Sequence, residues 1–357
     1  MPFLNNVSKM KKLLFSLSLL ASVAYFSACS TDVELYADYK DIPVVYGLLD
    51  ASVDTNFIRI NRAFSGSNDH PINANEVALI ADSCNYPGKL NAYIVKYRSS
   101  YGNTYTPTGD TMYLDTLTLH DKEEGVFYSP SQKVYFTDQH LDVNTGNTKY
   151  KYKLCICKDN DTVTSETALV GGQDFRIVTY TLSFSPEDNG NTSKVKFTAA
   201  DNAVFYDVKM VFNYKESINE GPMVDKSVSY SFGNHSIEDM PMENGALYYV
   251  TYSDNVLFNL LETAIGSDTV VDPNHPNVVR SFDEWPMLIT VSGGGDELYN
   301  YIKVNSQTGY SQSIPDYSNV TGGYGVFSSK INLTQSAKLS SGAQRALYAK
   351  PWGFVQQ

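Results

Sequence analysis

Short strand-like runs separated by turn-forming residues are the feature that most constrains this fold. Runs of β-branched and aromatic residues recur at roughly ten-residue spacing, and the gaps between them hold clusters such as Asn85-Tyr86-Pro87-Gly88 and Asn144-Thr145-Gly146-Asn147. The abundance of Tyr (27) and Phe (17) also favours strands over helices. We therefore predict a mainly β protein made of two Ig-like, antiparallel β-sandwich modules.

The flexible dipeptide Gly171-Gly172 is the predicted boundary between the two modules. The first module is expected to span residues 41–171 and the second 172–335. The predicted strands are residues 42–49, 56–64, 76–81, 90–98, 112–119, 133–137, 149–158 and 162–169, then 176–184, 194–199, 205–214, 226–232, 246–252 and 287–292. Helical spacing of apolar residues predicts short helices over 253–264 and 296–307. Residues 336–357 show little apolar periodicity, which predicts a flexible tail.

The N-terminus has the layout of a secretory signal peptide, predicted over residues 1–29. Lys9, Lys11 and Lys12 precede an apolar run over 13–26, and small residues come just before Cys29. This run is too short for a transmembrane span, which needs about 20 residues. We expect the body of the protein to fold outside the cytoplasm.

Cys29 is the predicted lipidation site. Phe26-Ser27-Ala28-Cys29 resembles the bacterial lipobox, in which the cysteine is diacylated, for example with palmitate, and becomes the mature N-terminus. Two acyl chains anchor a protein stably. Residues 30–40 would then be a tether, whose early acidic residues resemble the signal that exports Bacteroidota lipoproteins to the cell surface. The alternatives are an ordinary signal peptide with an incidental cysteine, and a tether without an export signal.

The mature chain is strongly acidic. Beyond Cys29 it carries 24 Lys and Arg against all 39 Asp and Glu, a net charge of −15. Nucleic-acid binding depends on neutralising phosphates, so this charge argues against a nucleic-acid partner. It also argues against electrostatic docking on anionic lipid. The predicted membrane attachment is therefore the lipid on Cys29, at the outer membrane and facing the periplasm or the cell surface.

The remaining cysteines predict neither a disulfide framework nor a metal site. Cys84, Cys155 and Cys157 are odd in number, and the last two share one face of a predicted strand. We expect reduced buried thiols, with a bond from Cys84 to one of the others as the alternative. No histidine lies close to this pair, so no metal site is predicted.

Motifs for catalysis and cofactor binding are missing from the sequence. The histidines lack metalloprotease spacing, and no nucleophile elbow occurs. Glu123-Glu124 fits a solvated turn better than a glycosidase pair. Gly293-Gly294-Gly295 could form an anion-binding nest, but Asp296 and Glu297 place negative charge at that helix end, which favours a structural turn. We predict a non-enzymatic protein without a cofactor.

Aromatic residues near the C-terminus are candidates for a binding surface. Tyr and Trp suit interfaces because one part of the side chain packs while the other forms hydrogen bonds. The alternative is that these side chains pack in the core. The candidates are Trp285, Tyr299, Tyr301, Tyr310, Tyr317 and Tyr324.

Four Asp-Thr-aliphatic triplets resemble the Bacteroidota O-glycosylation sequon. Short patterns of this kind also arise by chance in threonine-rich strands. The candidate acceptors are Thr111, Thr116, Thr162 and Thr269.

Three segments resemble a Bacteroidota envelope lipoprotein family known as domain-of-unknown-function family 4249. They are residues 44–65 (VVYGLLDASVDTNFIRINRAFS), 289–307 (ITVSGGGDELYNYIKVNSQ) and 316–330 (DYSNVTGGYGVFSSK). The family's closing motif would comprise Tyr317, Asn319, Gly322, Gly323, Gly325 and Phe327. The resemblance implies an envelope lipoprotein expected alongside TonB-dependent outer-membrane transporters, and it implies no activity.

Three functional hypotheses follow from the sequence. The first is a lipid-anchored accessory subunit that binds or helps to assemble an outer-membrane partner such as a TonB-dependent transporter. The second is a surface lipoprotein that binds a glycan or a peptide through the Tyr-rich C-terminal module. The third is an unrecognised hydrolase, which would require a cleft with convergent polar groups.

Overall fold

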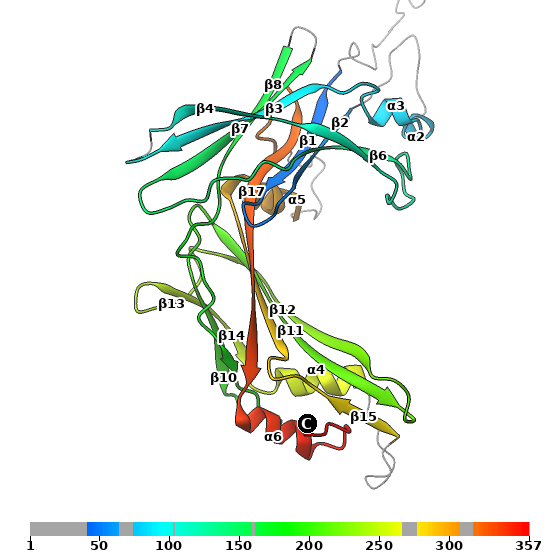
Figure 1. Ribbon diagram of the computed structural model, residues 1–357, viewed down its shortest axis with the longest axis vertical. Helices are drawn as coiled ribbons and strands as arrows, with labels where there is room; N and C mark the ends of the chain where they lie inside the picture. The colour runs from blue at the N-terminus through cyan, green and yellow to red at the C-terminus, as the bar shows by residue number, and fades with distance from the viewer. Residues whose placement is uncertain are drawn as a thin grey trace, which may run out of the picture. The chain divides into compact units, whose positions relative to one another are not determined.

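The computed structural model describes residues 41–63, 74–102, 104–158, 161–265, 277–306 and 317–356. Strands account for 50% and helices for 13% of the chain, so the prediction of a mainly β, sandwich-like fold is confirmed. Asp41–Ala63 and Ala78–Gln357 form one compact unit, which contains all the helices and strands of the described residues except α2 (Figure 1).

Many short strands and a few short helices make up the structure. The strands from the first half of the chain are β1 (Pro43–Leu49), β2 (Asn56–Arg62), β3 (Asn91–Ser99), β4 (Thr106–Tyr113), β5 (Asp115–Leu119), β6 (Gln132–Thr137), β7 (Lys149–Lys158) and β8 (Asp161–Ala168). Those that follow are β9 (Thr181–Leu182), β10 (Thr192–Thr198), β11 (Phe205–Ile218), β12 (Val224–Ser236), β13 (Met242–Glu243), β14 (Leu247–Ser253), β15 (Val278–Ser281), β16 (Met287–Gly294) and β17 (Tyr324–Leu339). The helices are α2 (Ala74–Val77), α3 (Ala81–Cys84), α4 (Val256–Ile265), α5 (Asp296–Ser306) and α6 (Ser341–Ala349).

Strand β17 joins two halves of one long sheet, whose order is β12-β11-β16-β17-β1-β2-β6-β5. Its first part pairs in parallel with β1, as far as Leu49↔Ser329. Its second part pairs antiparallel with β16, starting at Gly294↔Lys330. Figure 1 shows this strand in orange to red beside both neighbours. The strand therefore changes partner between Ser329 and Lys330.

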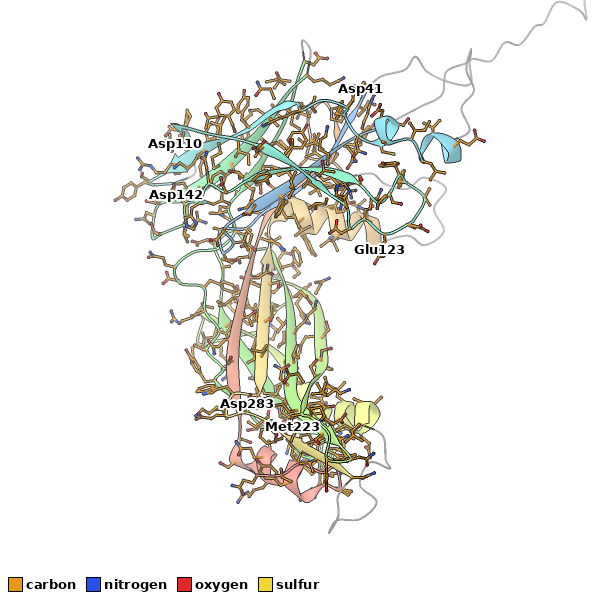
Figure 2. The ribbon with its side chains drawn as sticks, turned by 45° about the vertical axis from the view of Figure 1, so that its right-hand side comes forward. Asp41, Asp110, Glu123, Asp142, Met223 and Asp283 are labelled. Carbon is orange, nitrogen blue, oxygen red and sulfur yellow. The ribbon has the colours of Figure 1, made fainter. Side chains whose placement is uncertain are left out.

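The first hydrophobic core lies between the β1-β2-β6 part of the long sheet and the β4-β3-β7-β8 sheet. Alternate residues of β1 are buried, as expected for a strand with one face in a core. Ile58 and Ile94 contribute from the two sheets, and Phe327 of β17 is fully buried in the same cluster. At the rim, the Lys96 ammonium lies 2.6 Å from Asp110 and 2.7 Å from Asp142, two carboxylates marked in Figure 2.

The second hydrophobic core contains residues of β11, β16, β10 and β14, and α4 and α6 pack on it. Phe197 and Phe212 are among its buried aromatic residues. Leu169 belongs to the first core and Val170 to the second, beside the glycine pair predicted as the boundary.

Glycine allows the close pairing of β17 with β1. Gly325 has a φ of +109°, and a Cβ there would lie 2.0 Å from the carbonyl oxygen of Val45. Only glycine fits so close to a neighbouring backbone. Gly294 at the end of β16 leaves room for a neighbouring side chain instead, because a Cβ there would lie 2.2 Å from the Phe205 ring.

Two predictions from the sequence are wrong. Residues 76–81, expected as a strand, contain the end of α2, a turn and the start of α3. Residues 336–357 do not form a flexible tail, because β17 continues to Leu339 and α6 follows. Ser340 caps α6 by accepting a hydrogen bond from the amide of Ala343, and Leu347 and Trp352 are buried. The apolar side chains were too few to reveal this helix as a periodic pattern.

Candidate functional site

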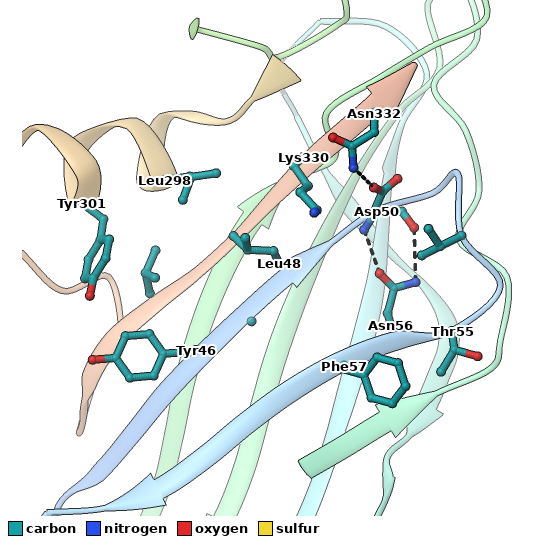
Figure 3. Close-up of a pocket in the computed structure, with 13 residues that line it drawn as sticks. Tyr46, Leu48, Asp50, Thr55, Asn56, Phe57, Leu298, Tyr301, Lys330 and Asn332 are labelled. Carbon is teal, nitrogen blue, oxygen red and sulfur yellow. Dashed lines mark hydrogen bonds between the residues drawn. The ribbon is translucent and has the colours of Figure 1, made fainter. Parts of the chain in front are cut away.

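A cavity of about 490 Å³ lies between α5 and strands β17, β1 and β2 (Figure 3). We call it the α5 groove. Its volume falls within the roughly 300–1,000 Å³ of small-molecule sites. Its lining is Tyr46, Gly47, Leu48, Asp50, Val53, Thr55, Asn56, Phe57, Leu298, Tyr301, Val326, Lys330 and Asn332.

Strand alternation explains why the sheet contributes these side chains. Successive side chains of a strand point to opposite faces. Tyr46 and Leu48 therefore point to the same side of β1, and Tyr46 is in register with Val326 on β17. Lys330 continues that face of β17 toward the end of the groove. Figure 3 shows Tyr46 and Leu48 on the side of the sheet where Leu298 and Tyr301 of α5 lie, and it shows the lining residue Lys330 on β17.

The N-terminus of α5 is held against the sheet by Glu297. Its carboxylate accepts hydrogen bonds from the hydroxyls of Ser328 (3.0 Å) and Thr167 (3.1 Å). The Ser328 hydroxyl also accepts from the amide of Leu298 at 3.2 Å. Burial raises the pKa of Glu297, although both hydroxyl contacts act in the opposite direction. The glycine run and this acidic residue thus position the helix.

Asp50 organises the turn at the polar end of the groove. Its Oδ1 accepts from the amide (2.9 Å) and the hydroxyl (2.5 Å) of Ser52, and its Oδ2 accepts from Asn332 Nδ2 at 3.0 Å. Asn56 Oδ1 accepts from the Asp50 amide at 2.7 Å, and Asn56 Nδ2 donates to the Asp50 carbonyl at 3.2 Å. Both carboxylate oxygens therefore already have donors, one set from Ser52 in the turn and one from Asn332 on β17.

Lys330 differs from the other basic residues. Among the lysines and arginines that the structure describes, it is the only half-buried one with no ion pair, hydrogen bond or aromatic ring contact. It lines the groove from the point where β17 changes partner. The lining thus combines a half-buried lysine that has no ion pair among the described residues with a carboxylate that accepts from Ser52 and Asn332.

Aromatic rings form the apolar end of the groove. Tyr46 and Tyr301 meet edge to face, with ring centroids 6.2 Å apart. The Arg59 guanidinium lies 5.3 Å from the Tyr46 ring centroid. Leu298 and Val326 extend this apolar surface. The arrangement suits a ligand with an apolar body and one polar end.

Of the aromatic residues proposed for binding, Tyr301 lines the groove. Tyr299 packs on Phe205 instead, with centroids 5.6 Å apart. The hydroxyl of Tyr317 bonds the side chain of Asn300, and burial raises the Tyr317 pKa. Tyr310 lies outside the described residues.

The two remaining aromatic candidates lie away from the groove lining. Tyr324 is 48% exposed at the start of β17. Trp285 lies under the Lys338 ammonium, 4.4 Å from its ring centroid. Of the five candidates that the structure describes, Tyr301 alone therefore lines the groove.

The modification candidates lie on or near strands of the first core. Thr111 on β4 and Thr116 on β5 are half-buried, and Thr162 on β8 is exposed. Thr269 and the proposed lipidation site Cys29 lie outside the described residues. The thiols of Cys84, Cys155 and Cys157 are free, and Cys84 Sγ donates to the carbonyl oxygen of Ala78 at 3.2 Å.

Tyr46, Asp50 and Lys330 were missed as site residues. These residues lie in segments 44–65 and 316–330, which both carry the family resemblance described above. The parallel pairing of β1 with β17 places these two segments side by side. A long-range parallel pairing leaves no local signal in a sequence, which explains why the groove was not predicted.

The part of the chain that the structure describes contains neither a cluster of metal ligands nor a helix that could span a membrane. No group of three or more His, Cys, Asp or Glu residues there could hold a metal ion. No helix there is long and apolar enough to cross a membrane. Comparison with protein-family models finds no match, and neither does a search of curated proteins.

Proposed function

We propose that this chain is a non-enzymatic envelope lipoprotein, held at the outer membrane by lipid on Cys29, which binds a partner in the α5 groove. The observation that carries this proposal is the groove itself. Its charged side chains are Asp50, which accepts from Ser52 and Asn332, and Lys330, which contacts no nucleophile or base among the residues that the structure describes. Such a lining favours binding over catalysis, so the hydrolase hypothesis has the least support.

The proposed partner is an outer-membrane protein, with a TonB-dependent transporter as the leading candidate. The family resemblance of the segments around the groove supports this choice. The acidic charge of the mature chain gives the membrane surface little hold on the body. Lipid attachment combined with a protein contact would therefore keep the protein at its partner.

Site-specific photo-crosslinking in native membranes tests this function. A photoreactive phenylalanine analogue at Tyr46 would lie in the groove, and the same analogue at Tyr180, which is 55% exposed and not part of the lining, is the matched control. We expect a discrete crosslinked partner from position 46 that position 180 does not give. Identical products from both positions, or none from position 46, would contradict the proposal.

Glycan binding is a second candidate, favoured by a tyrosine-rich face of the β4-β3-β7-β8 sheet. Tyr93 and Tyr113 form a cross-strand pair with centroids 5.7 Å apart. Tyr97 and Tyr105 line a smaller cavity of about 230 Å³ with Lys151. Glycan-array binding that is lost in Tyr97→Ala and Tyr105→Ala, but kept in Tyr46→Ala, would support this candidate over the groove.

A further inference from the structure

We infer that the α5 groove recognises a carboxylate attached to an apolar body, and that Lys330 is its counter-ion. This inference rests on the proposed function, because it names the class of ligand for the same groove.

The first argument is that Lys330 has no ion pair or hydrogen bond among the residues that the structure describes. A half-buried lysine is expected to use its ammonium as a donor to a nearby acceptor. The other half-buried lysines show this. Lys96, Lys149 and Lys158 each have a carboxylate oxygen within 2.7 Å. An anionic group of a ligand would complete the same arrangement at Lys330.

Asp50 does not take that role, although it lines the same cavity. Its two oxygens accept hydrogen bonds from Ser52 and Asn332. No ion pair joins its carboxylate to the Lys330 ammonium, within the part of the chain that the structure describes. The ammonium therefore remains available to a ligand that enters from the apolar end.

The charges around the groove favour a monoanion over a phosphate. Among the described residues, Lys330 is the only basic side chain that lines the groove, because the Arg59 guanidinium lies over the Tyr46 ring and is not part of the lining. The Asp50 carboxylate disfavours each negative charge on a ligand, so a dianion is disfavoured more than a monoanion. The α5 N-terminus adds little attraction for anions, because Glu297 lies against it and Asp296 precedes it. A single carboxylate matches a single ammonium under these conditions.

The other walls define the rest of the ligand. Leu48, Leu298 and Val326 are aliphatic, and the Tyr46 and Tyr301 rings close the apolar end. Two sources supply an apolar carboxylate of this size: the C-terminal residue of a polypeptide, and a fatty acid. They share the chemistry that the groove would recognise, and they can be separated by experiment.

The test measures binding of two acids and their uncharged amides to the full mature chain in lipid nanodiscs by calorimetry. N-acetyl-L-phenylalanine represents a polypeptide terminus, and octanoate represents a fatty acid. We expect at least one acid to bind roughly 10- to 100-fold more tightly than its amide, as for a hydrogen bond to a charged group. Tighter binding of N-acetyl-L-phenylalanine would agree with a polypeptide partner, whereas tighter binding of octanoate would identify a fatty acid and would contradict a protein partner in this groove.

Variants assign the preference to Lys330. Lys330→Gln should remove the difference between acid and amide, and Lys330→Arg should keep most of it. Lys338→Gln, which changes a half-buried lysine outside the groove, should bind like the wild-type chain.

The outcomes separate this inference from the proposed function. Equal binding of acid and amide, or an unchanged preference in Lys330→Gln, would overturn carboxylate recognition. If neither acid binds while the probe at Tyr46 still crosslinks a partner, the inference is wrong and the proposed function stands.

Discussion

Arg280 and Glu216 form a buried ion pair between β15 and β11. Arg280 Nε and Nη2 lie 2.9 and 2.6 Å from Glu216 Oε2. Nη1 donates to the carbonyl oxygen of Trp352 at 2.6 Å, which ties the C-terminal segment to the same pair. The guanidinium thus connects two strands with the residues that follow α6.

Arg280→Met should lower the free energy of unfolding by about 3–5 kcal/mol, because it leaves the Glu216 carboxylate buried without its main partner. Urea denaturation followed by tryptophan fluorescence measures the loss. The control Lys89→Met removes the exposed pair with Asp115 and should have little effect. The double variant Arg280→Met/Glu216→Met should recover part of the loss. If Arg280→Met were as stable as the control Lys89→Met, this account of the pair would be contradicted.

Gly325→Ala should disrupt the parallel pairing of β17 with β1. An alanine there would be strained at a φ of +109°, and its Cβ would clash with the Val45 carbonyl oxygen. Gly190→Ala is the control, since it also has a positive φ (+73°) but has open space around the added methyl group. It should cost about 1–2 kcal/mol from strain alone. Thermal unfolding should show a clearly larger loss for Gly325→Ala, and equal losses would argue against a steric role.

Asn319→Ala should weaken the loop that leads into β17. The Asn319 side chain donates to the Phe327 carbonyl oxygen at 2.7 Å and accepts from the Phe327 amide at 3.0 Å, as a neighbouring strand would. Loss of both contacts should cost about 1–3 kcal/mol, because buried backbone groups lose their partners. Asn305→Ala on the exposed side of α5 is the control. Similar denaturation midpoints for both variants would refute this role.

Glu297→Gln should change how stability depends on pH. The pKa of Glu297 is raised in the folded state above its ordinary value of 4.5. At pH values between the pKa of an unfolded glutamate and the higher pKa of Glu297 in the folded state, the folded protein binds more protons than the unfolded chain. Its stability therefore falls as the pH rises through this interval. Glutamine cannot ionise. The variant should therefore gain stability relative to the wild type as the pH rises from below 4.5 toward neutrality.

Denaturation curves of Glu297→Gln and wild type at several pH values measure this trend. Glu262→Gln, at an exposed position on α4 that does not act on Glu297, is the control. A constant difference between Glu297→Gln and wild type across the range would mean that Glu297 does not titrate as proposed.

Cys29→Ser should release the protein from membranes. Without acyl chains the acidic body has no electrostatic attraction to anionic lipid. Fractionation after a high-salt wash should find the variant in the soluble fraction and the wild type in the membrane fraction. Retention of the variant would require another anchor or a stable membrane partner.

The sequence predicted most strands because local alternation marks them. Residues 149–158 and 205–214, for example, correspond to β7 and most of β11. The 16-residue β17 was not recognised. Gly325 interrupts its start, and its later part lies in the stretch predicted as a flexible tail. Local patterns cannot show that one strand serves two cores, since that depends on contacts between distant segments.

The groove was predicted only in part. Tyr301 was proposed because the aromatic helix was visible in the sequence. Lys330 appeared as an ordinary strand residue, because its lack of a partner is a property of the folded surroundings. Asp50 resembled a turn residue, and the structure shows it bonded within a turn.

The shared strand β17 also governs when the first core can form. Val44 near the start of the described chain pairs with Tyr324 near its end, and Phe327 fills the core beneath. While the chain is being synthesised, the first core lacks a strand until residues 324–329 have been made, and such long-range pairing is slow to form. A chain whose first core needs a late strand stays unfolded longer in the compartment where it is synthesised. This delay favours passage through a secretion channel before folding, as the predicted signal peptide requires.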